Sequence, residues 1–430
     1  MRVLICGASG FIGRHLGREL LRHGHTVVAL ARQPRPDARI DFASELLRGD
    51  MARDLSPEDW LPRLAGLDAV VNAVGILRER GSQTFDRLHV QGPIALFDAC
   101  ARAGVPRVLQ ISALGADEGA RSGYHLSKRQ ADTHLLALPL DATVVQPSLV
   151  YGPGGASATM FTAWASLPWV PLPQAGAQRV QPLHIDDLVQ ALRVLLEGRE
   201  ARGQRLALVG PQALSLRELL ASLREGMGLG PAHWIEVPAP LVRGTVALGS
   251  RWPGALADHE TLDMLERGNT APADATTALL GHAPRPVRSF IDPERADTER
   301  TQARLAWLLP LLRLSLAAVW IVTGVLSFGV YPVADSHALL ARVGLTGLMA
   351  SIALYGAATL DLALGVATLA GRGRPWVWWS QIVLMLGYMV LITWALPEFW
   401  LHPFGPILKN LPMLAAVALL LALEKPKWNT

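Results

Sequence analysis

The last quarter of this 430-residue chain is too apolar for an ordinary water-soluble domain. Residues 314–423 include only seven charged side chains in 110 positions, whereas the other 320 positions carry 69 of the chain's 76 charges. Charged side chains cover much of the surface of a soluble domain, so a stretch this poor in them indicates a lipid environment. The sequence therefore predicts a membrane domain at the C-terminal end and a soluble domain before it.

Four long apolar segments follow one another in this region, at residues 305–330, 345–369, 376–396 and 406–423. A helix that spans a bilayer needs about 20 apolar residues, and the first three segments supply them. The fourth has an apolar core of thirteen residues from Leu411 and needs residues 406–410 to reach across. We expect an all-α, four-helix transmembrane domain; a buried helical domain is the alternative.

Positive charges gather on one side of the predicted spans. They are Arg300, Arg304 and Arg313 before the first span, Arg372 and Arg374 between the second and third, and Lys425 and Lys427 after the fourth. The two opposite loops hold only Arg342 and Lys409. Because cytoplasmic loops are the ones enriched in Lys and Arg, the sequence predicts a multi-pass protein of the inner (cytoplasmic) membrane with both termini in the cytoplasm.

The N-terminal part alternates between strand-like and helix-like stretches. Apolar, β-branched runs lie at residues 2–6, 26–31, 69–73, 107–112 and 142–147, and helical periodicity appears at 11–23, 84–103 and 124–137. Nearly continuous apolar strands that alternate with helices indicate a parallel sheet covered on both faces. We expect an α/β fold of the Rossmann type, a doubly wound parallel sheet whose ligands bind at the carboxyl ends of the strands.

The predicted boundaries divide the chain into three parts. Residues 1–290 form the Rossmann-type domain, with a smaller lid at about 150–290; residues 291–304 form a linker, and 305–430 the membrane domain. Within the lid, helical patterns occur at 187–197, 215–225 and 256–266, and Asp186 or Asp187 is the expected N-cap of the first.

The composition argues against several classes of protein. Cys6 and Cys100 are too few for a disulfide scaffold or a zinc module, and no metal site is expected. A net charge of +4 gives no argument for nucleic-acid binding.

A glycine-rich turn follows the first strand directly and opens a helix. In its sequence, Gly7-Ala8-Ser9-Gly10-Phe11-Ile12-Gly13, the first glycine permits a tight turn, the second lets backbone N–H groups approach a pyrophosphate, and the third allows close helix packing. The positive end of the helix dipole lies at the same place and further favours the binding of an anion. We expect the cofactor to contact Gly7, Ser9, Gly10, Phe11, Ile12 and Gly13; a structural glycine turn is the alternative.

The end of the second strand bears on which nucleotide is bound. Sites that bind NAD commonly carry an acidic residue here, which binds the ribose hydroxyls, whereas an arginine such as Arg32 suits the 2′-phosphate of NADP. Arg14 can assist Arg32 in binding that phosphate. The sequence thus favours NADP(H) over NAD(H). Arg32 as one more surface cation is the alternative. Asp50 is expected either to accept from the adenine amine or to cap a turn. Further expected cofactor contacts, at the ends of later strands or beyond them, are Asn72, Pro147 and Lys128.

Tyr124 and Lys128 form a Tyr-x-x-x-Lys pattern just beyond the fifth strand. Residues four apart share a helix face, and an ammonium near a phenol lowers the phenol's pKa, so Tyr124 could exchange a proton with a carbonyl or alcohol at neutral pH. Lys128 is also expected to bind the nicotinamide ribose, and Ser112 to polarise the same substrate oxygen. A solvated helix face is the alternative.

These residues together resemble the short-chain dehydrogenase/reductase superfamily over about residues 1–290. More narrowly, they are similar to the atypical branch that contains the NADPH-binding accessory subunit of respiratory complex I. The matching stretches are residues 7–14, 71–76, 111–117, 146–153 and 181–187. The resemblance implies the fold, the cofactor and Tyr124 with Lys128 as the family pair. Many relatives carry a run of Ser or Thr where this chain has Ser112-Ala113-Leu114, and the branch includes members that bind NADPH without evident turnover.

The C-terminal 125 residues resemble the DoxX-like four-helix membrane family, on residues 354–361, 397–406 and 409–412. Relatives of that family are associated with quinone-linked redox chemistry. Two functions are expected from the resemblances. The first is a membrane-anchored NAD(P)H-dependent oxidoreductase acting on a small apolar carbonyl or quinone-like lipid. The second is a non-catalytic NADPH-binding membrane protein that docks a respiratory or quinone-biosynthesis partner and serves respiratory-complex or ubiquinone-related assembly.

Two polar features of the membrane part have either a functional or a structural role. Asp361 lies in the middle of the second span, where a carboxyl group must face the bundle interior; it is either functional or the partner of an interhelical hydrogen bond. Glu398, His402 and Lys409 share the loop before the fourth span. They form either a small polar site or an interfacial loop.

Overall fold

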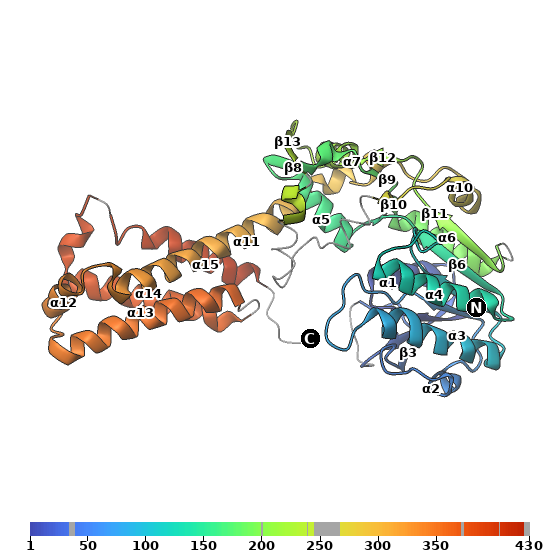
Figure 1. Ribbon diagram of the computed structural model, residues 1–430, viewed down its shortest axis with the longest axis horizontal. Helices are drawn as coiled ribbons and strands as arrows, with labels where there is room; N and C mark the ends of the chain where they lie inside the picture. Colours follow the sequence, from blue (N-terminus) through green and yellow to red (C-terminus); the bar gives the residue numbers. More distant parts are fainter. Residues whose placement is uncertain are drawn as a thin grey trace. The chain divides into compact units, whose positions relative to one another are not determined.

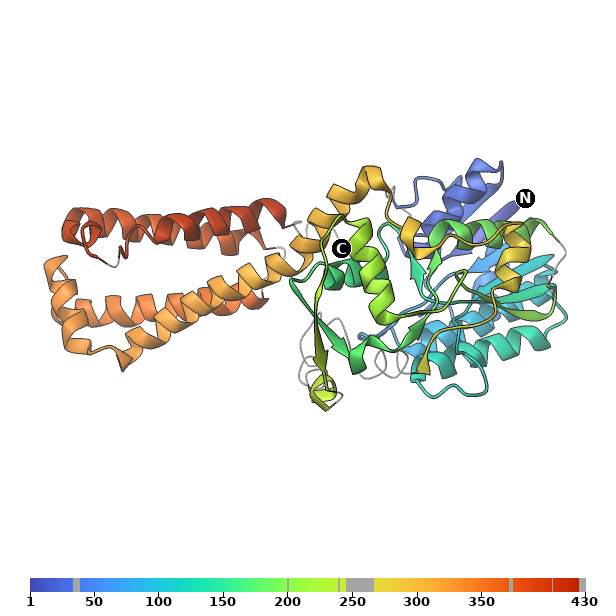
Figure 2. The same ribbon diagram turned by 90° about the horizontal axis from the view of Figure 1, so that it is seen from above.

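The computed structural model describes residues 1–33, 39–198, 201–238, 240–244, 267–370, 374–403 and 405–424. The chain divides into two compact units, unit 1 at Met1–Ala303 and unit 2 at Arg304–Thr430. The two units differ in architecture, as Figures 1 and 2 show: unit 1 is built on a sheet, and the part of unit 2 that the structure describes is helical.

Unit 1 is built on a seven-stranded parallel sheet with the strand order β11-β6-β5-β4-β1-β2-β3. The strands are β1 (Arg2–Cys6), β2 (Thr26–Ala31), β3 (Glu45–Arg48), β4 (Ala69–Asn72), β5 (Arg107–Ile111), β6 (Ala142–Pro147) and β11 (Gln204–Leu208). The order reverses beside β1, which pairs with β2 on one side and β4 on the other. In such sheets the ligand crevice lies at this switch point, outside the carboxyl ends of the strands.

Helices cover both faces of the sheet (Figure 1). They are α1 (Phe11–Arg22) and α6 (Ile185–Glu197) over one face, and α3 (Gly92–Ala103) and α4 (Gly123–Ala137) over the other, with the short α2 (Pro57–Trp60) beside α3. Leu16 and Leu192 are wholly buried in the first core, Phe97 and Leu135 in the second. The predicted doubly wound α/β fold is confirmed, and its two cores explain why the strands are apolar along their whole length.

A smaller subdomain follows β6. It contains α5 (Ala156–Ala165), α7 (Leu216–Gly226) and the short strands β7 (Val150–Tyr151), β8 (Trp169–Pro173), β9 (Arg179–Val180), β10 (Leu183–His184), β12 (Leu214–Ser215) and β13 (His233–Val237). Helix α10 (Asp274–Leu280) packs on α6 and β11 and belongs to the core of the main sheet. Strand β11, which lies in the region predicted as a lid, pairs with β6 instead and extends the main sheet. The helix predicted at 256–266 lies outside the described residues.

Two local expectations differ from the structure. The N-cap of α6 is His184, whose Nδ1 accepts a hydrogen bond from the Asp186 N–H at 3.3 Å, rather than Asp186 or Asp187. The helix begins earlier than expected, and Asp187 is buried inside it, where it accepts from the Arg285 N–H at 2.7 Å. In the region predicted as a linker, a helix, α11 (Ala296–Val325), begins at Ala296, and Ala303 is buried.

Unit 2 contains most of α11, then α12 (Val333–Arg342), α13 (Gly347–Ala370), α14 (Pro375–Ala395) and α15 (Asn410–Leu423). The helical stretch 293–330, α13 and α14 are long and apolar enough to cross a membrane, whereas α15 has 14 residues. The predicted apolar helices are confirmed, three of them of spanning length and the fourth shorter. The short α12 between the first two spans was not expected from the sequence.

A buried polar network joins the helices of unit 2. Arg313 donates to the Thr368 carbonyl at 2.7 Å, its guanidinium lies 4.9 Å from the Trp378 ring centroid, and it forms an ion pair with Glu424. Gln381 continues the network, donating to Thr368 Oγ1 at 2.8 Å and accepting from the Trp320 indole at 2.8 Å. Polar groups inside a membrane bundle must find protein partners, and this network provides them.

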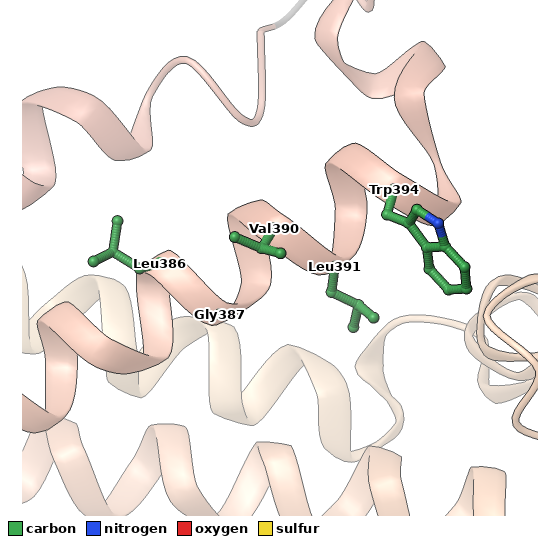
Figure 3. Close-up of a pocket in the computed structure, with 5 residues that line it drawn as sticks. All are labelled: Leu386, Gly387, Val390, Leu391 and Trp394. Carbon is green, nitrogen blue, oxygen red and sulfur yellow. The ribbon is translucent and has the colours of Figure 1, made fainter.

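The remaining surface of unit 2 is largely apolar. Figure 3 shows a shallow groove along α14, lined by Leu386, Gly387, Val390, Leu391 and Trp394. At the loops, Glu398 pairs with Arg342, and the His402 ring stacks on Phe399 with centroids 6.1 Å apart. The Glu398 carboxylate is therefore paired with the end of α12, the short helix between the first two spans.

Candidate functional site

The glycine turn after β1 forms a cradle that only glycines can build. Gly7 adopts a φ of +82°, and a Cβ there would lie 2.8 Å from the Ala73 carbonyl oxygen. A Cβ on Gly13 would lie 2.2 Å from the Gly7 carbonyl oxygen, so the helix packs directly on the turn. The N-cap Gly10 offers no capping side chain, and the first turn of α1 carries no acid. These features fit a pyrophosphate, because the first N–H groups of the helix remain available to an anion.

The other predicted residues of the turn surround this cradle. Ser9 is exposed, and Phe11 and Ile12 are half-buried at the first two positions of α1. Arg14 donates to the Gly154 carbonyl at 2.8 Å, so its guanidinium is already engaged with the turn at 153–154.

Arg32 and Asp50 follow neighbouring strands. Arg32 is exposed directly after β2, the strand next to β1. Asp50 follows β3 and accepts from the Ala52 N–H at 3.0 Å through Oδ1. Asp50 thus caps the turn after β3, and Arg32 lies at the end of β2, where the sequence predicts a 2′-phosphate contact.

Asn72 and Pro147 mark the carboxyl ends of β4 and β6. Asn72 is wholly buried, donates to Gln110 Oε1 at 2.8 Å and accepts from the Val74 N–H at 3.1 Å. It pairs in register with Cys6, so it lies beside the start of the glycine turn. The Pro147 carbonyl accepts from the Leu114 N–H at 3.0 Å. Both residues thus shape the loops at the sheet's ligand-binding edge.

Lys128 is buried at this edge. Its Nζ donates to the Val74 carbonyl at 3.0 Å and to the Ile111 carbonyl at 3.1 Å, which tie it to the ends of β4 and β5. Burial lowers its pKa to about 8, while the negative charge of Asp132 opposes that change. The ammonium has three donors, and these two bonds use only two of them.

Tyr124 lies on the same helix as Lys128, in the first turn of α4. Its half-buried ring packs edge-on against His89 and Phe85, with centroids 5.4 Å and 6.1 Å away. Burial, together with the charge of Asp132, raises the pKa of Tyr124 to about 12. This is opposite to the lowering expected from Lys128, since burial outweighs any effect of the ammonium here.

Ser112 does not point its hydroxyl toward Tyr124. It is buried, and its Oγ donates to the carboxylate of Asp132 on α4. This differs from the expected role of polarising the substrate oxygen, because the hydroxyl proton is already committed.

Asp132 is the functional candidate that the sequence reasoning missed. It is wholly buried, and its Oδ1 has no hydrogen-bond partner among the described residues. Burial raises the pKa of Asp132 to about 6, and the Ser112 hydroxyl and the Lys128 ammonium partly counter that rise. The available signal was its spacing, four residues after Lys128 on the same helix face.

His89 was also missed, and it connects the loop after β4 to α4. Its Nε2 accepts from the Ile76 N–H at 3.0 Å and its Nδ1 lies 3.0 Å from Ser127 Oγ, which donates to the Tyr124 carbonyl at 2.8 Å. Burial lowers the pKa of His89 to about 2, and the Lys128 charge adds to this. His89 is therefore neutral at physiological pH, and its hydrogen bonds hold its ring in place against the Tyr124 ring.

Each part of the chain matches a known protein family. Residues 3–210 match the NAD dependent epimerase/dehydratase family, and residues 317–418 match the DoxX-like family. These matches confirm the two resemblances that were stated from the sequence motifs. The first covers the whole sheet and the cradle, and the second covers the spans from residue 317.

Individual relatives include reductases and respiratory proteins. A ceramide reductase of Caulobacter vibrioides is 29% identical over 253 residues, which cover 58% of this chain and 78% of that protein. A mitochondrial protein of Arabidopsis thaliana, NADH dehydrogenase (ubiquinone) 1 alpha subcomplex subunit 9, is 25% identical over 259 residues, covering 56% of this chain and 62% of that protein. Among solved structures, MoeE5 in complex with UDP-glucuronic acid and NAD matches 69% of this chain and 99% of its own, with a TM-score of 0.52 and 25% identity.

The buried carboxyl of Asp132 should make stability depend on pH. Its pKa is raised from 3.8 to about 6 in the folded chain, so its favourable contribution is complete below pH 4 and is lost as pH rises through 6. A shift of about 2 pKa units corresponds to about 3 kcal/mol. We expect Asp132→Asn, which keeps an oxygen for Ser112, to gain up to about that much unfolding free energy relative to the wild type between pH 4 and pH 7.

Thermal unfolding of the full chain in detergent at several pH values measures this difference. Asp41→Asn is the control, because the Asp41 side chain is exposed on the surface of the same unit. A difference between Asp132→Asn and the wild type that stays constant from pH 4 to pH 7 would contradict the expectation.

Proposed function

We propose that the chain is a membrane-anchored, NADPH-dependent oxidoreductase that reduces a carbonyl or quinone-like lipid. The proposal starts from the matches of residues 3–210 to the NAD dependent epimerase/dehydratase family and of residues 317–418 to the DoxX-like family. The family matches support an NAD(P)-binding domain of oxidoreductase type joined to a membrane domain.

One observation carries the proposal. The Lys128 ammonium is buried between the carbonyls of Val74, two residues beyond β4, and Ile111, the last residue of β5, and Tyr124 lies one helical turn before it. The glycine cradle follows β1, the neighbour of β4 in the sheet. A cation, a phenol and an anion-binding turn thus meet at the edge where ligands of doubly wound sheets bind.

The residues divide the work of a carbonyl reduction. A bound nicotinamide cofactor supplies the hydride. With a pKa of about 12, Tyr124 keeps its proton at neutral pH and is in the right state to donate it to a carbonyl oxygen. Lys128 offers its third N–H to a ribose hydroxyl, and Asp132 opposes the loss of the Lys128 charge on burial. The glycine cradle holds the pyrophosphate.

Two observations support a lipid as the substrate. The membrane domain tethers the reductase domain to a bilayer, where apolar substrates concentrate. A ceramide reductase is among the relatives, with 29% identity over 253 residues. A quinone-like substrate rests on the DoxX-like match alone.

A second function is favoured by the Ser112 geometry. The Ser112 hydroxyl is bound to Asp132, and the next two residues, Ala113 and Leu114, have no hydroxyl to replace it. A site without that donor suits a protein that binds NADPH and does not turn over, and serves respiratory-complex or ubiquinone-related assembly with a respiratory or quinone-biosynthesis partner. The complex I subunit of Arabidopsis thaliana, 25% identical over 259 residues, supports this alternative. A screen of the purified protein for NADPH oxidation with quinones and lipid carbonyls separates the two.

Tyr124→Phe should abolish most of the turnover and leave cofactor binding unchanged. The ring and its packing against His89 persist, but the exchangeable proton is lost, and general acid–base losses of this kind cost about 10²–10⁴ in rate. Lys128→Met should weaken both turnover and NADPH affinity. Steady-state rates and cofactor titrations measure these effects, with Tyr355→Phe in α13 as the matched control. A Tyr124→Phe rate within about threefold of the wild type would favour the non-catalytic alternative.

NADPH should bind more tightly than NADH, because Arg32 stands where an NAD site carries an acid. A charged contact to the 2′-phosphate is worth about 1.5–3 kcal/mol, which is about tenfold or more in affinity. Titration of both cofactors against the wild type and Arg32→Asp tests this, and the variant should lose the preference. Arg22→Asp on the exposed end of α1 makes the same charge change elsewhere. Equal wild-type affinities for NADPH and NADH would refute the assignment.

We expect a C-terminal reporter to lie in the cytoplasm of a bacterial host. Seven Lys and Arg residues flank the spans on the side that carries both termini, against two on the other side, and such an excess is retained in the cytoplasm. Paired reporters that are active only in the cytoplasm or only in the periplasm measure the location. A periplasmic signal would reverse the proposed orientation in the inner membrane.

A further inference from the structure

The ribbon formed by β8 and β13 has an apolar outer face. The two strands are parallel and side by side (Figures 1 and 2), with Trp169 opposite His233 and Pro171 opposite Ile235. Trp169 is 63% exposed and Ile235 47% exposed, and Leu241, four residues beyond the ribbon, is 61% exposed. Trp169 and Leu241 are the most exposed large hydrophobic side chains among the described residues of unit 1.

The inner face of the ribbon is packed as firmly as a core. Val170 and Leu172 alternate with the exposed residues of β8 and are buried against α7, where Leu220 is wholly buried. The Trp164 indole donates to the Pro171 carbonyl at 2.9 Å, which fixes β8 further. The outward position of Trp169 and Ile235 is therefore set by the two-residue period of strands whose other face is held in place.

The same small core holds the beginning of α11. Ala303 is buried in the cluster that contains Val170 and Leu172, and Arg300 donates to the Met227 carbonyl at 3.2 Å. Beyond Ala303 the helix continues to Val325 into the first apolar stretch of spanning length. The ribbon thus shares its supporting core with the segment through which this unit is joined to a membrane helix.

We propose that the outer face of the β8–β13 ribbon docks on the bilayer surface, with Trp169, Ile235 and Leu241 lying at the boundary between lipid headgroups and acyl chains. Trp favours this boundary because its ring is amphipathic. A cation accompanies the patch in the sequence, because Arg243 follows Leu241 by two residues. Such a mixture of aromatic, aliphatic and basic side chains is typical of interfacial binding. Glu236 is the one exposed acid of β13.

The bilayer is favoured over a protein partner because the chain carries its own membrane helices. A surface patch on a tethered domain meets the lipid at a high effective concentration, so even weak interfacial contacts are occupied. The proposal concerns binding and does not depend on turnover; it can fail while the reductase function stands, and the reverse also holds.

The full chain, reconstituted in vesicles of phosphatidylethanolamine and phosphatidylglycerol, provides the test. Ile235→Cys and Leu21→Cys are labelled with an environment-sensitive fluorophore; both native side chains are 47% exposed, and the native Cys6 and Cys100 are buried. We expect spin-labelled lipids to quench the label at 235 several-fold more than the label at 21 on α1. Equal quenching at the two positions would overturn the proposal.

Two further measurements exclude other occupants and misfolding. A label at 235 that is shielded from aqueous iodide but not quenched by lipid would mean that protein covers the ribbon, and the proposal would be wrong. In the double variant Trp169→Asn and Ile235→Asn, a label at Leu241→Cys should lose at least half of its lipid quenching while NADPH affinity is unchanged, which shows that the unit remains folded. Undiminished quenching in that variant would contradict the role of these two side chains.

Discussion

The ammonium of Lys128 is buried, and much of the site follows from accommodating that charge. A charge taken out of water is tolerated only with partners at hydrogen-bond distance. Two carbonyls supply them, from Val74 beyond β4 and from Ile111 at the end of β5, and Asp132 adds a negative charge on the same helix. The ends of two strands and the first half of α4 are thereby held together. The Asn72 amide, which bonds to the Val74 N–H, positions one of those carbonyls.

The second unit also buries a cation and stabilises it with a backbone carbonyl and a carboxylate. Arg313 is buried among the helices and is met by a backbone carbonyl, that of Thr368, and by a carboxylate, that of Glu424. In each unit a cation therefore ties together segments that are distant in sequence. Removing the Glu424 carboxylate would leave the Arg313 charge uncompensated, which is costlier than never having buried the pair.

Local sequence patterns predicted the framework of unit 1 well and its site only in part. The strands expected at residues 2–6, 26–31 and 142–147 have those bounds in the structure, because a buried parallel strand is apolar over its whole length. The glycine turn was predictable because the steric requirement for its glycines arises largely within a stretch of seven residues. Asp132 and His89 were missed because their roles arise from contacts with Ser112 and Ile76, which lie 20 and 13 residues away. The N-cap of α6 was predicted wrongly because the His184 imidazole accepts the capping hydrogen bond that an Asp carboxylate commonly accepts.

The length of α15 has a consequence for the lipid around it. Fourteen helical residues rise about 21 Å, whereas the hydrocarbon core of a bilayer is about 30 Å thick. The carboxylate that follows the helix, Glu424, is held by Arg313 and by the Trp378 indole at 2.9 Å, so the helix end is tied in place. Local thinning of the membrane is one of the ways in which a hydrophobic mismatch of this size is relieved, beside snorkelling of flanking residues and oligomerisation. The bilayer beside α15 is therefore expected to be compressed, which lowers the barrier that a polar headgroup must cross there.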